Sequence, residues 1–421
     1  MLRIVHFLDI LEERSKSELK SDMSEGDFLL VCSIIDKEKE FLNSVSQNIW
    51  KNPELAYKEF HAHDVLTDAL SSNGFQVEKH YILPTAFKAE YSSKTGNGPV
   101  IAVLLEYDAL PDIGHACGHN LISEAGLATS LAIKAVMEAD PKLEGKLLVL
   151  GTPAEECSGG KIDLLDAGAF REVDAAMMVH PSNFTSTYAP VLSRLSMTVD
   201  FKGKESHAAA FPWEGRNALD AAVSTYQNIS LLRQHIKPSN RIHAIITKGG
   251  VVPNVIPAES TLQMAVRSAT KAELKDLTAR IMECVKSGAV ATGCTASIDC
   301  DEKHCYESLV TNKVMGKLYD QYARKLGIYP TDFSGKDVPA GSTDMGNVSH
   351  AIPSIHPFYD INTESQNHSK SFTEASGDTK AQEPTLKVAK ALAMTALILM
   401  RYPETMEEAK KQFNLDITGG L

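Results

Sequence analysis

Three short apolar runs that each end in carboxylate or imidazole side chains constrain the fold of this chain most strongly. The runs VIAVLLEYDALP (100–111), KLLVLGTPAEE (146–156) and VDAAMMVHP (173–181) are separated by helical patterns near 123–138 and 160–169. This alternation predicts an α/β domain with a mostly parallel sheet flanked by helices. Because ligands bind beyond the carboxyl ends of parallel strands, we expect a site at the edge where the three runs end.

The pattern changes between residues 191 and 303. This segment predicts a strand, an amphipathic helix, two strands, a second helix and a last strand, in the order β-α-β-β-α-β. That order is typical of a ferredoxin-like unit, and its length suits one small domain. We therefore predict a lid or dimerisation domain at 191–303, inserted into a discontinuous metal-binding catalytic domain of residues 31–190 and 304–421. Residues 1–30 are expected to form an N-terminal extension.

Composition makes several classes of partner improbable. A formal net charge of -12 removes any general attraction for nucleic acid or anionic lipid. The apolar run ALAMTALILM at 391–400 is about half as long as a membrane span, so we expect a buried helix and no membrane partner. Seven Cys, an odd number, suit reduced thiols better than a disulfide framework. We therefore expect a cytoplasmic protein without structural disulfides.

Cys117 and His119 lie in the sequence HACGHN, between the first predicted strand and the following helix. Thiolate and imidazole together suit a borderline-soft metal such as zinc. A buried thiol beside a helix-capping imidazole is the plain structural alternative. Asp108, at the end of the strand, could hydrogen-bond a metal-bound His and tune its basicity.

Glu155, Glu156, His180 and His368 extend this candidate set. The two adjacent carboxylates end the second run, where one can bind metal while the other moves a proton. His180 ends the third run, and His368 lies in the polar loop QNHSKSF. Taken singly, the carboxylates suit a solvated loop, His180 a structural hydrogen bond and His368 simple exposure. Only as a set do they predict a metal centre.

The predicted lid carries candidate groups for substrate binding. His207 precedes its first helix, where it could stabilise an oxyanion or serve only as a surface cap. Arg267 on a strand and Asn254 in VVPNVIP are natural partners of a carboxylate and a carbonyl. The loop GSTDMG, which begins with Gly341 and Ser342, could line the substrate pocket. Nucleotide chemistry lacks support, because the sequence has no Walker or Rossmann glycine pattern.

The motifs YDALP, HACGHN, PAEE, MMVHP, ESHAAAFPWEGRNALD and NHSKSF, in this order, resemble those of the aminoacylase, carnosinase and aminobenzoyl-glutamate hydrolase family of cocatalytic metallopeptidases. The resemblance runs from about residue 35 to the C-terminus and implies a zinc-exopeptidase-like fold and a homodimer. The motifs are most similar to a branch that hydrolyses dipeptides with a basic C-terminal residue, such as beta-alanyl or gamma-aminobutyryl peptides of Lys, Arg or ornithine, in metabolite repair. An N-acyl amino acid or aminobenzoyl-glutamate amidohydrolase is the alternative.

The resemblance also implies roles for individual residues. Two divalent metal ions, zinc before Mn2+ or Co2+, would be bound by Cys117, His119, Glu156, His180 and His368, with Cys117 at the bridging position. Glu155 would be the general base, Asp108 the acid behind the ligands, His207 the lid histidine that reaches the partner subunit's site, and Asn254 and Arg267 the grips on the substrate's amide and carboxylate. The sequence departs from the family motif H-x-D-x-x-P, because Glu106 stands at the His position. We expect His119 to compensate.

Two other classes remain open at this point. A thiol enzyme with Cys117 as its nucleophile beside His119 leaves Glu155, Glu156 and two distant His unexplained. A non-catalytic scaffold on the same fold leaves the candidate ligand set without a use. Dipeptide turnover measured with and without a chelator separates all three.

Overall fold

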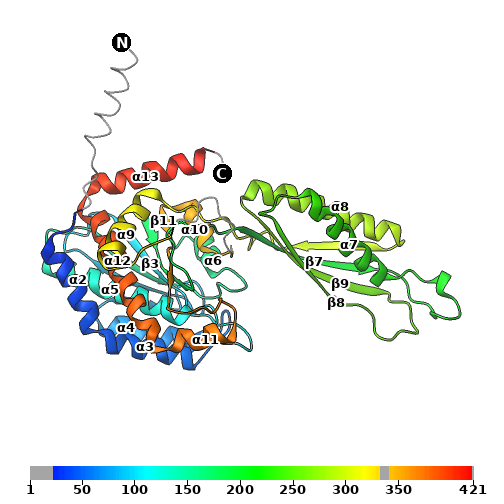
Figure 1. Ribbon diagram of the computed structural model, residues 1–421, viewed down its shortest axis with the longest axis horizontal. Helices are drawn as coiled ribbons and strands as arrows, with labels where there is room; N and C mark the ends of the chain where they lie inside the picture. The colour runs from blue at the N-terminus through cyan, green and yellow to red at the C-terminus, as the bar shows by residue number, and fades with distance from the viewer. Residues whose placement is uncertain (1–21, 332–340, 420–421) are drawn as a thin grey trace, which may run out of the picture. The chain divides into compact units, whose positions relative to one another are not determined.

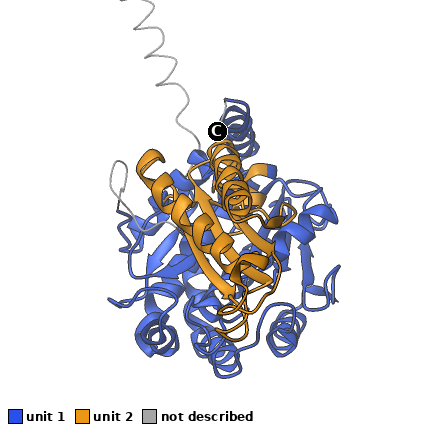
Figure 2. Cartoon of the chain, turned by 90° about the vertical axis from the view of Figure 1, so that its right-hand side faces the viewer, with its two compact units in different colours: residues 1–189, 310–336, 351–419 blue, residues 190–309, 337–350, 420–421 orange. Residues whose placement is uncertain are grey.

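The chain divides into two compact units in the computed structural model, which describes residues 22–331 and 341–419 (Figures 1 and 2). Among the described residues, unit 1 comprises 22–189, 310–331 and 351–419, and unit 2 comprises 190–309 and 341–350. Residues 341–350 therefore lie in unit 2, whereas the sequence pattern had grouped them with the catalytic domain.

Unit 1 contains a sheet with the strand order β1-β2-β4-β3-β5-β11. Its strands are β1 (Gln76–Lys79), β2 (Phe87–Ser92), β3 (Val100–Leu105), β4 (Lys146–Gly151), β5 (Ala175–Met177) and β11 (Ser354–Ile355). From β4 to β11 neighbouring strands are parallel, which confirms the predicted sheet type, and β1 and β2 add an antiparallel edge that the sequence pattern did not predict. Buried positions run almost unbroken along β3 and β4, as in strands covered on both faces.

The third apolar run forms two short strands instead of one. After β5 ends, β6 (His180–Ser182) pairs in parallel with β12 (Phe358–Asp360), and His180 lies opposite Phe358. β5 pairs with β11 in the same way, so two segments far apart in the sequence run side by side from β5 to β6. His180 is thereby held beyond the carboxyl end of β5, next to the segment that follows β11.

Helices surround this sheet in unit 1 (Figure 1). They are α2 (Glu25–Lys37), α3 (Lys39–Lys51), α4 (Phe60–Ser72), α5 (His119–Ala139), α6 (Gly160–Asp166), α9 (Lys313–Lys325), α11 (Lys370–Gly377), the 3-10 turn η3 (Thr379–Ala381), α12 (Gln382–Arg401) and α13 (Pro403–Thr418). α5 packs against β3, β4 and α12, and its small residues allow this close approach. A Cβ on Gly126 would lie 2.6 Å from Leu105 Cδ1 on β3. The run 391–400 lies in α12 and is buried throughout.

The predicted N-terminal extension overlaps helix α2. Phe28 and Leu30 are partly buried against the core of unit 1, and Val31 and Ile35 of the same helix are fully buried. Residues 1–21 lie outside the described part of the chain.

Unit 2 is an antiparallel sheet covered by two helices. The sheet order is β10-β7-β9-β8, formed by β7 (Ser193–Lys202), β8 (Arg241–Lys248), β9 (Glu259–Ser268) and β10 (Thr295–Cys300). The helical segments are η1 (Pro212–Glu214), α7 (Ala218–Leu232), η2 (Arg233–His235), α8 (Lys271–Ala291) and α10 (Met345–Ala351). Alternate residues of β7 and β9 are buried, because only one face of the sheet packs on α7 and α8. This arrangement confirms the predicted β-α-β-β-α-β unit.

None of the seven Cys, all of which lie among the described residues, forms a disulfide. Within residues 22–331 and 341–419, no helix combines the length and the apolar character that crossing a bilayer would need.

Candidate metal centre

Carboxylates and imidazoles from three strand ends and two loops converge in unit 1. Glu106 and Asp108 follow β3, Glu155 and Glu156 follow β4, and His180 begins β6. Since β3, β4 and β5 are parallel, these groups meet at one edge of the sheet. Glu106 and Asp108 keep the alternation of a strand, so Tyr107 between them points the other way and donates to the Thr85 carbonyl.

Donor atoms at this edge form three groups. Within each group the candidate ligand atoms all lie within 4.8 Å of one another: Cys117, His119 and His180; Cys117, Glu156 and His368; and Glu106, His119 and Glu155. The first two groups share the Cys117 sulfur. The sulfur is thus common to a pair of imidazoles and to a carboxylate–imidazole pair, and such an arrangement can hold two ions.

The spacing of these donors fits tetrahedral coordination. With bonds of about 2.0–2.1 Å to N or O and about 2.3 Å to S, neighbouring ligand atoms lie about 3.3 Å apart for N and O and about 3.6 Å apart for S and N. His368 Nε2 and Glu156 Oε2 are separated by 3.4 Å. Cys117 Sγ and His180 Nε2 are separated by 3.5 Å. The residues present therefore fit small divalent cations with mixed sulfur, nitrogen and oxygen ligands.

Gly118 explains why Cys117 and His119 can serve the same site. Its φ of +75° is left-handed, and a Cβ there would lie 2.6 Å from Pro181 Cγ. The turn at this glycine places Cys117 just before α5 and His119 at its first residue. The Cys-Gly-His spacing thus has a backbone requirement as well as a chemical one.

Asp108 connects three of the converging segments. Its Oδ1 lies 2.9 Å from His119 Nδ1, and its Oδ2 accepts from the Glu156 backbone N–H at 2.9 Å. Burial opposes ionisation of this carboxyl, yet the His119 imidazole beside it keeps its pKa below the usual range. The Asp108–His119 hydrogen bond directs His119 Nε2 toward the donor cluster, where that atom has no hydrogen-bond partner among the described residues.

The charge state of Cys117 argues against a thiol nucleophile. Burial raises the pKa of the Cys117 thiol well above its usual value, although His119 acts in the opposite direction. Burial also lowers the pKa of the neighbouring His180 to about 4, so this ring is neutral at pH 7. A thiol in such a place becomes a thiolate when a metal cation supplies the missing positive charge.

His368 occupies the rim of the cluster. Its side chain is 55% exposed, its φ is +66°, and its backbone N–H donates to the Ala116 carbonyl at 2.8 Å. The adjacent Asn367 side chain donates to the Pro181 carbonyl at 3.1 Å. These contacts tie the loop after β12 to the segments of Cys117 and His180.

Glu59 and Lys161 belong to the surroundings of this centre and were not predicted from the sequence. Glu59 is fully buried, accepts from the Tyr57 and Ala154 backbone N–H groups and from Thr85 Oγ1, and so holds the chain just before Glu155. Lys161, near the start of α6, is also fully buried and lies 2.5 Å from Glu106 Oε1. No local signal identifies either residue, since a Glu before a helix and a Lys in a helix's first turn are ordinarily solvated.

The candidate substrate groups of unit 2 form two separate pairs. His207 and Asn254 belong to adjoining loops, since the Ala208 N–H donates to the Asn254 carbonyl at 3.0 Å. Arg267 Nη1 donates to Ser342 Oγ at 2.9 Å, next to Gly341. His207 and Asn254 lie near the start of β9 and Arg267 near its end, which places the pairs roughly 26 Å apart along the strand.

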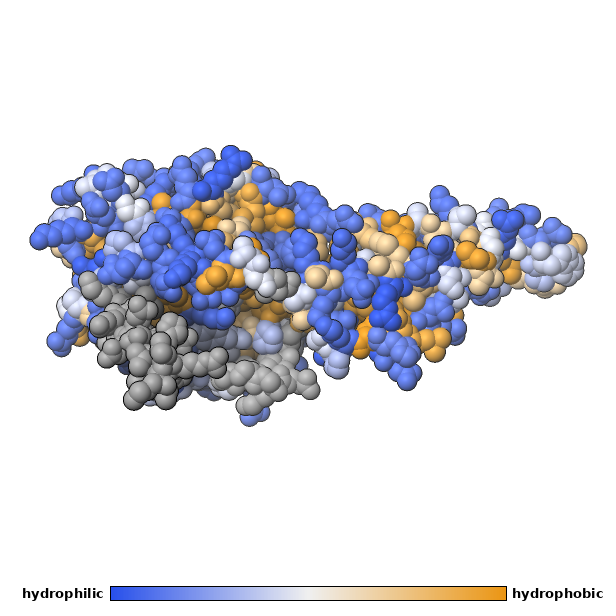
Figure 3. Space-filling view, turned by 90° about the horizontal axis from the view of Figure 1, so that it is seen from above, coloured by the Kyte–Doolittle hydropathy of each residue, from blue (hydrophilic) through white to orange (hydrophobic). Residues whose placement is uncertain are grey.

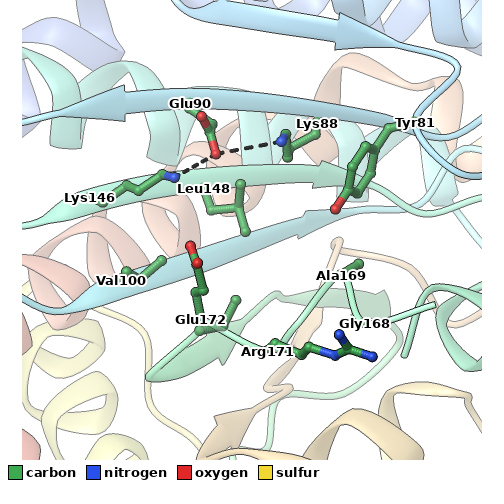
Figure 4. Close-up of a pocket in the computed structure, with 11 residues that line it drawn as sticks. Tyr81, Lys88, Glu90, Val100, Lys146, Leu148, Gly168, Ala169, Arg171 and Glu172 are labelled. Atoms are coloured by element: carbon green, nitrogen blue, oxygen red, sulfur yellow. Dashed lines mark ion pairs between the residues drawn. The ribbon is translucent and has the colours of Figure 1, made fainter. Parts of the chain in front are cut away.

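A hollow elsewhere in unit 1 does not carry this chemistry. Figure 4 shows it on the face of the sheet that bears Lys88, Glu90 and Lys146, and its cavity volume is about 270 Å³. Glu90 forms ion pairs with both lysines, at 3.8 Å to Lys88 and 2.6 Å to Lys146. Glu90 thus offsets part of the positive charge of the two lysines, and the lining of this hollow includes neither His nor Cys.

Comparisons with known proteins identify relatives of this chain. Residues 193–293 match the sequence profile described as a peptidase dimerisation domain. The chain is 46% identical over 394 residues to Xaa-Arg dipeptidase of Mus musculus, covering 90% of each protein. It is 31% identical over 309 residues to one of the subunits of p-aminobenzoyl-glutamate hydrolase from Escherichia coli, covering 68% of this chain and 63% of the relative. The fold resembles a dinuclear metal-binding M20 peptidase of Bacillus subtilis, with a TM-score of 0.67, 20% identity, and coverage of 87% of this chain and 99% of that one.

Proposed function

The chain belongs to the M20 family of metallopeptidases, and on that premise we propose that it hydrolyses the amide bond of dipeptides with a basic C-terminal residue. The observation that carries the proposal is the pair of donor groups that share Cys117, with Glu155 beside them. The similarity to Xaa-Arg dipeptidase supports the substrate class, namely peptides of Lys, Arg or ornithine, including beta-alanyl and gamma-aminobutyryl peptides.

The metal ligands in this proposal are Cys117, His119, Glu156, His180 and His368. Two bound divalent ions would lower the pKa of a water molecule and polarise the substrate's carbonyl. Zinc is our first choice because thiolate, imidazole and carboxylate donors together suit it, with Mn2+ and Co2+ as substitutes. Asp108 keeps His119 in the tautomer that presents Nε2 to the ion.

Glu155 is the proton carrier in this proposal. Its side chain is buried, and one of its oxygens lies within 4.8 Å of donor atoms of Glu106 and His119. This carboxylate takes a proton from water as the water oxygen bonds to the amide carbon. It then delivers the proton to the leaving nitrogen as the carbon–nitrogen bond breaks.

His207 can donate a hydrogen bond to an oxyanion through its Nε2 atom. Its Nδ1 accepts from the backbone N–H groups of Ala209 and Ala210, at 3.2 and 3.1 Å. A neutral ring in this geometry carries its proton on Nε2, and the side chain is exposed. We propose that His207 donates this proton in a hydrogen bond to the tetrahedral oxyanion.

We propose that the enzyme works as a homodimer and that His207 and Asn254 serve the partner subunit's site. Arg267, with Gly341 and Ser342, would hold the carboxylate of the substrate that is bound in its own subunit's site. The separation of the two pairs along β9 supports this, because a dipeptide is far shorter than roughly 26 Å. β8 is an edge strand with exposed Ile245 and Ile246, a surface suited to a partner, and Figure 3 shows hydrophobic patches among the hydrophilic surface of this unit.

We further propose a cytoplasmic enzyme of metabolite repair, with the small peptide as its partner and neither nucleic acid nor membrane. The free thiols and the net charge of -12 support this placement. Hydrolysis of aminobenzoyl-glutamate or another N-acyl amino acid is the second candidate, favoured by the similarity to the Escherichia coli p-aminobenzoyl-glutamate hydrolase.

The test is a mass-spectrometric turnover screen of the purified protein against dipeptides and N-acyl amino acids, with and without a chelator. We expect chelator-sensitive release of Lys, Arg or ornithine. Glu155→Gln should abolish turnover and keep its metal, whereas Glu124→Gln, a buried carboxylate on α5 that Gln382 hydrogen-bonds, should keep both. Preference for acyl-glutamates would move the assignment to the second candidate, and wild-type kcat in Glu155→Gln would refute the role of Glu155.

A further inference from the structure

Glu106 is a buried carboxylate whose two oxygens have different surroundings. Oε1 lies 2.5 Å from Lys161 Nζ, and both side chains are fully buried. Oε2 is also buried but has no hydrogen-bond partner among residues 22–331 and 341–419. A buried carboxylate oxygen without a partner is costly, which points to a ligand that would satisfy it.

The unpartnered oxygen faces the donor cluster. Glu106 Oε2 lies 3.4 Å from His119 Nε2, yet the two atoms form no hydrogen bond. His119 Nε2 also lies 3.8 Å from Glu156 Oε1 and has no hydrogen-bond partner among the described residues. Two ligands of one tetrahedral ion with bonds of about 2.0–2.1 Å stand about 3.3 Å apart. The geometry therefore suits two donors that face a common cation better than two donors that face each other.

We propose that Glu106 Oε2 is a further ligand of the ion that His119 Nε2 binds, and that Lys161 is the positioning residue that orients this carboxylate through Oε1. The inference rests on the two-ion site of the proposed function. Its consequence is an asymmetric centre, in which the ion at His119 has a carboxylate ligand from Glu106 that the ion at Cys117, Glu156 and His368 lacks. A closed ligand set is typical of a tightly held ion, and an open one of the ion that admits substrate.

Metal content, which needs no substrate, provides the test. The zinc-loaded full-length protein is titrated with a competing chelator, and zinc per chain is read by mass spectrometry of the metal. We expect the wild type to lose its two ions in separate steps. Glu106→Gln should weaken the tighter ion at least about 10-fold, since even groups behind metal ligands change affinity by 10–100-fold. The matched carboxylate-to-amide change Glu124→Gln should leave both steps in place.

A double variant separates ligation from simple ion pairing. If Glu106 only neutralises Lys161, zinc affinity falls in Glu106→Gln because a buried ammonium has lost this countercharge. Adding Lys161→Met should then restore the affinity of the tighter ion. If Glu106 is a ligand, Glu106→Gln with Lys161→Met should bind metal as weakly as Glu106→Gln alone. Recovery of wild-type affinity in the double variant would overturn the proposal.

The visible absorption of the Co2+-substituted protein gives a second readout. Loss of a carboxylate ligand changes the ligand field, so Glu106→Gln should alter the bands of the tighter site, and Glu106→Asp should partly preserve them. Lys161→Met should alter them less than Glu106→Gln. Unchanged bands in Glu106→Gln would refute ligation, even where that variant is less stable. A wild type that binds two ions but cleaves no dipeptide would refute the proposed function and leave this inference standing.

Discussion

Replacement of Asp108 by Asn tests the central connection of the candidate centre. Both carboxylate oxygens act as acceptors, one for His119 Nδ1 and one for the Glu156 backbone N–H, each at 2.9 Å. An Asn side chain has one acceptor oxygen and one NH2 group, so one of the two donors must face another donor. Either the orientation of His119 or that of the segment bearing Glu156 is then released, and both residues are proposed ligands.

The size of the effect follows from the bond that is lost. A hydrogen bond to a charged group contributes about 1.5–3 kcal/mol, which corresponds to roughly 10–150-fold in an equilibrium constant. We therefore expect Asp108→Asn to weaken zinc binding by roughly 10–150-fold in a chelator competition titration. kcat/KM at limiting zinc should fall in parallel.

Asp174→Asn is the matched control, because the Asp174 carboxylate accepts from the Val100 N–H at 2.8 Å at the opposite end of β3. It should cost fold stability without changing zinc affinity. If Asp108→Asn bound zinc within twofold of the wild type, the idea that Asp108 orients the ligands would be wrong.

Three further predictions concern the core, the buried carboxylates and unit 2. Gly126→Ala should lower the free energy of unfolding by about 1–3 kcal/mol in urea, because the new Cβ would lie 2.6 Å from Leu105 Cδ1; an unchanged midpoint would contradict the packing argument. Burial raises the pKa of Glu124 to about 7, so its contribution to stability is fully present below the unfolded-state pKa of about 4.5 and is lost as the pH rises through 7. The free energy of unfolding of Glu124→Gln should therefore rise relative to that of the wild type by on the order of 3 kcal/mol between pH 5 and pH 8. An equal difference in unfolding free energy at both pH values would disprove this. His207→Ala should lower kcat about 10²–10³-fold with zinc content unchanged, and a loss of zinc instead would mean a structural role.

The sequence was most informative where one physical rule acts along the chain. The apolar runs that form β3 and β4 are buried on both faces of the sheet. Such strands are almost continuously apolar, so they can be recognised in a single sequence. Because ligands bind beyond the carboxyl ends of parallel strands, the same pattern predicts a site at Asp108, Glu155 and His180, which the fold brings to one edge. The antiparallel pair β1 and β2 was missed because β1 is short and almost fully exposed, so it has no apolar pattern to detect.

Contacts between distant charged residues could not be predicted in the same way. Glu106 and Lys161 are 55 positions apart, and the Lys lies in a Gly-rich helix start that would ordinarily be solvated. The burial of Lys161 depends on the carboxylate of Glu106, which the family resemblance identified only as a substitute for His. Nothing local to either residue carries the information that the other is 2.5 Å away.

The two contacts of Glu106, with Lys161 and with His119, explain why a Glu stands at the position of the family's His. A His at this position could donate a neutral nitrogen to a metal but would deprive the buried Lys161 ammonium of this countercharge next to a doubly charged ion. A carboxylate can neutralise the ammonium through one oxygen and present the other to the donor cluster, where His119 Nε2 lies 3.4 Å away. A buried ion pair is weak evidence for stabilisation, because desolvation offsets much of the attraction between the partners. The Glu106–Lys161 pair is therefore better explained by the charge and geometry that it gives to the site than by the stability that it gives to the fold.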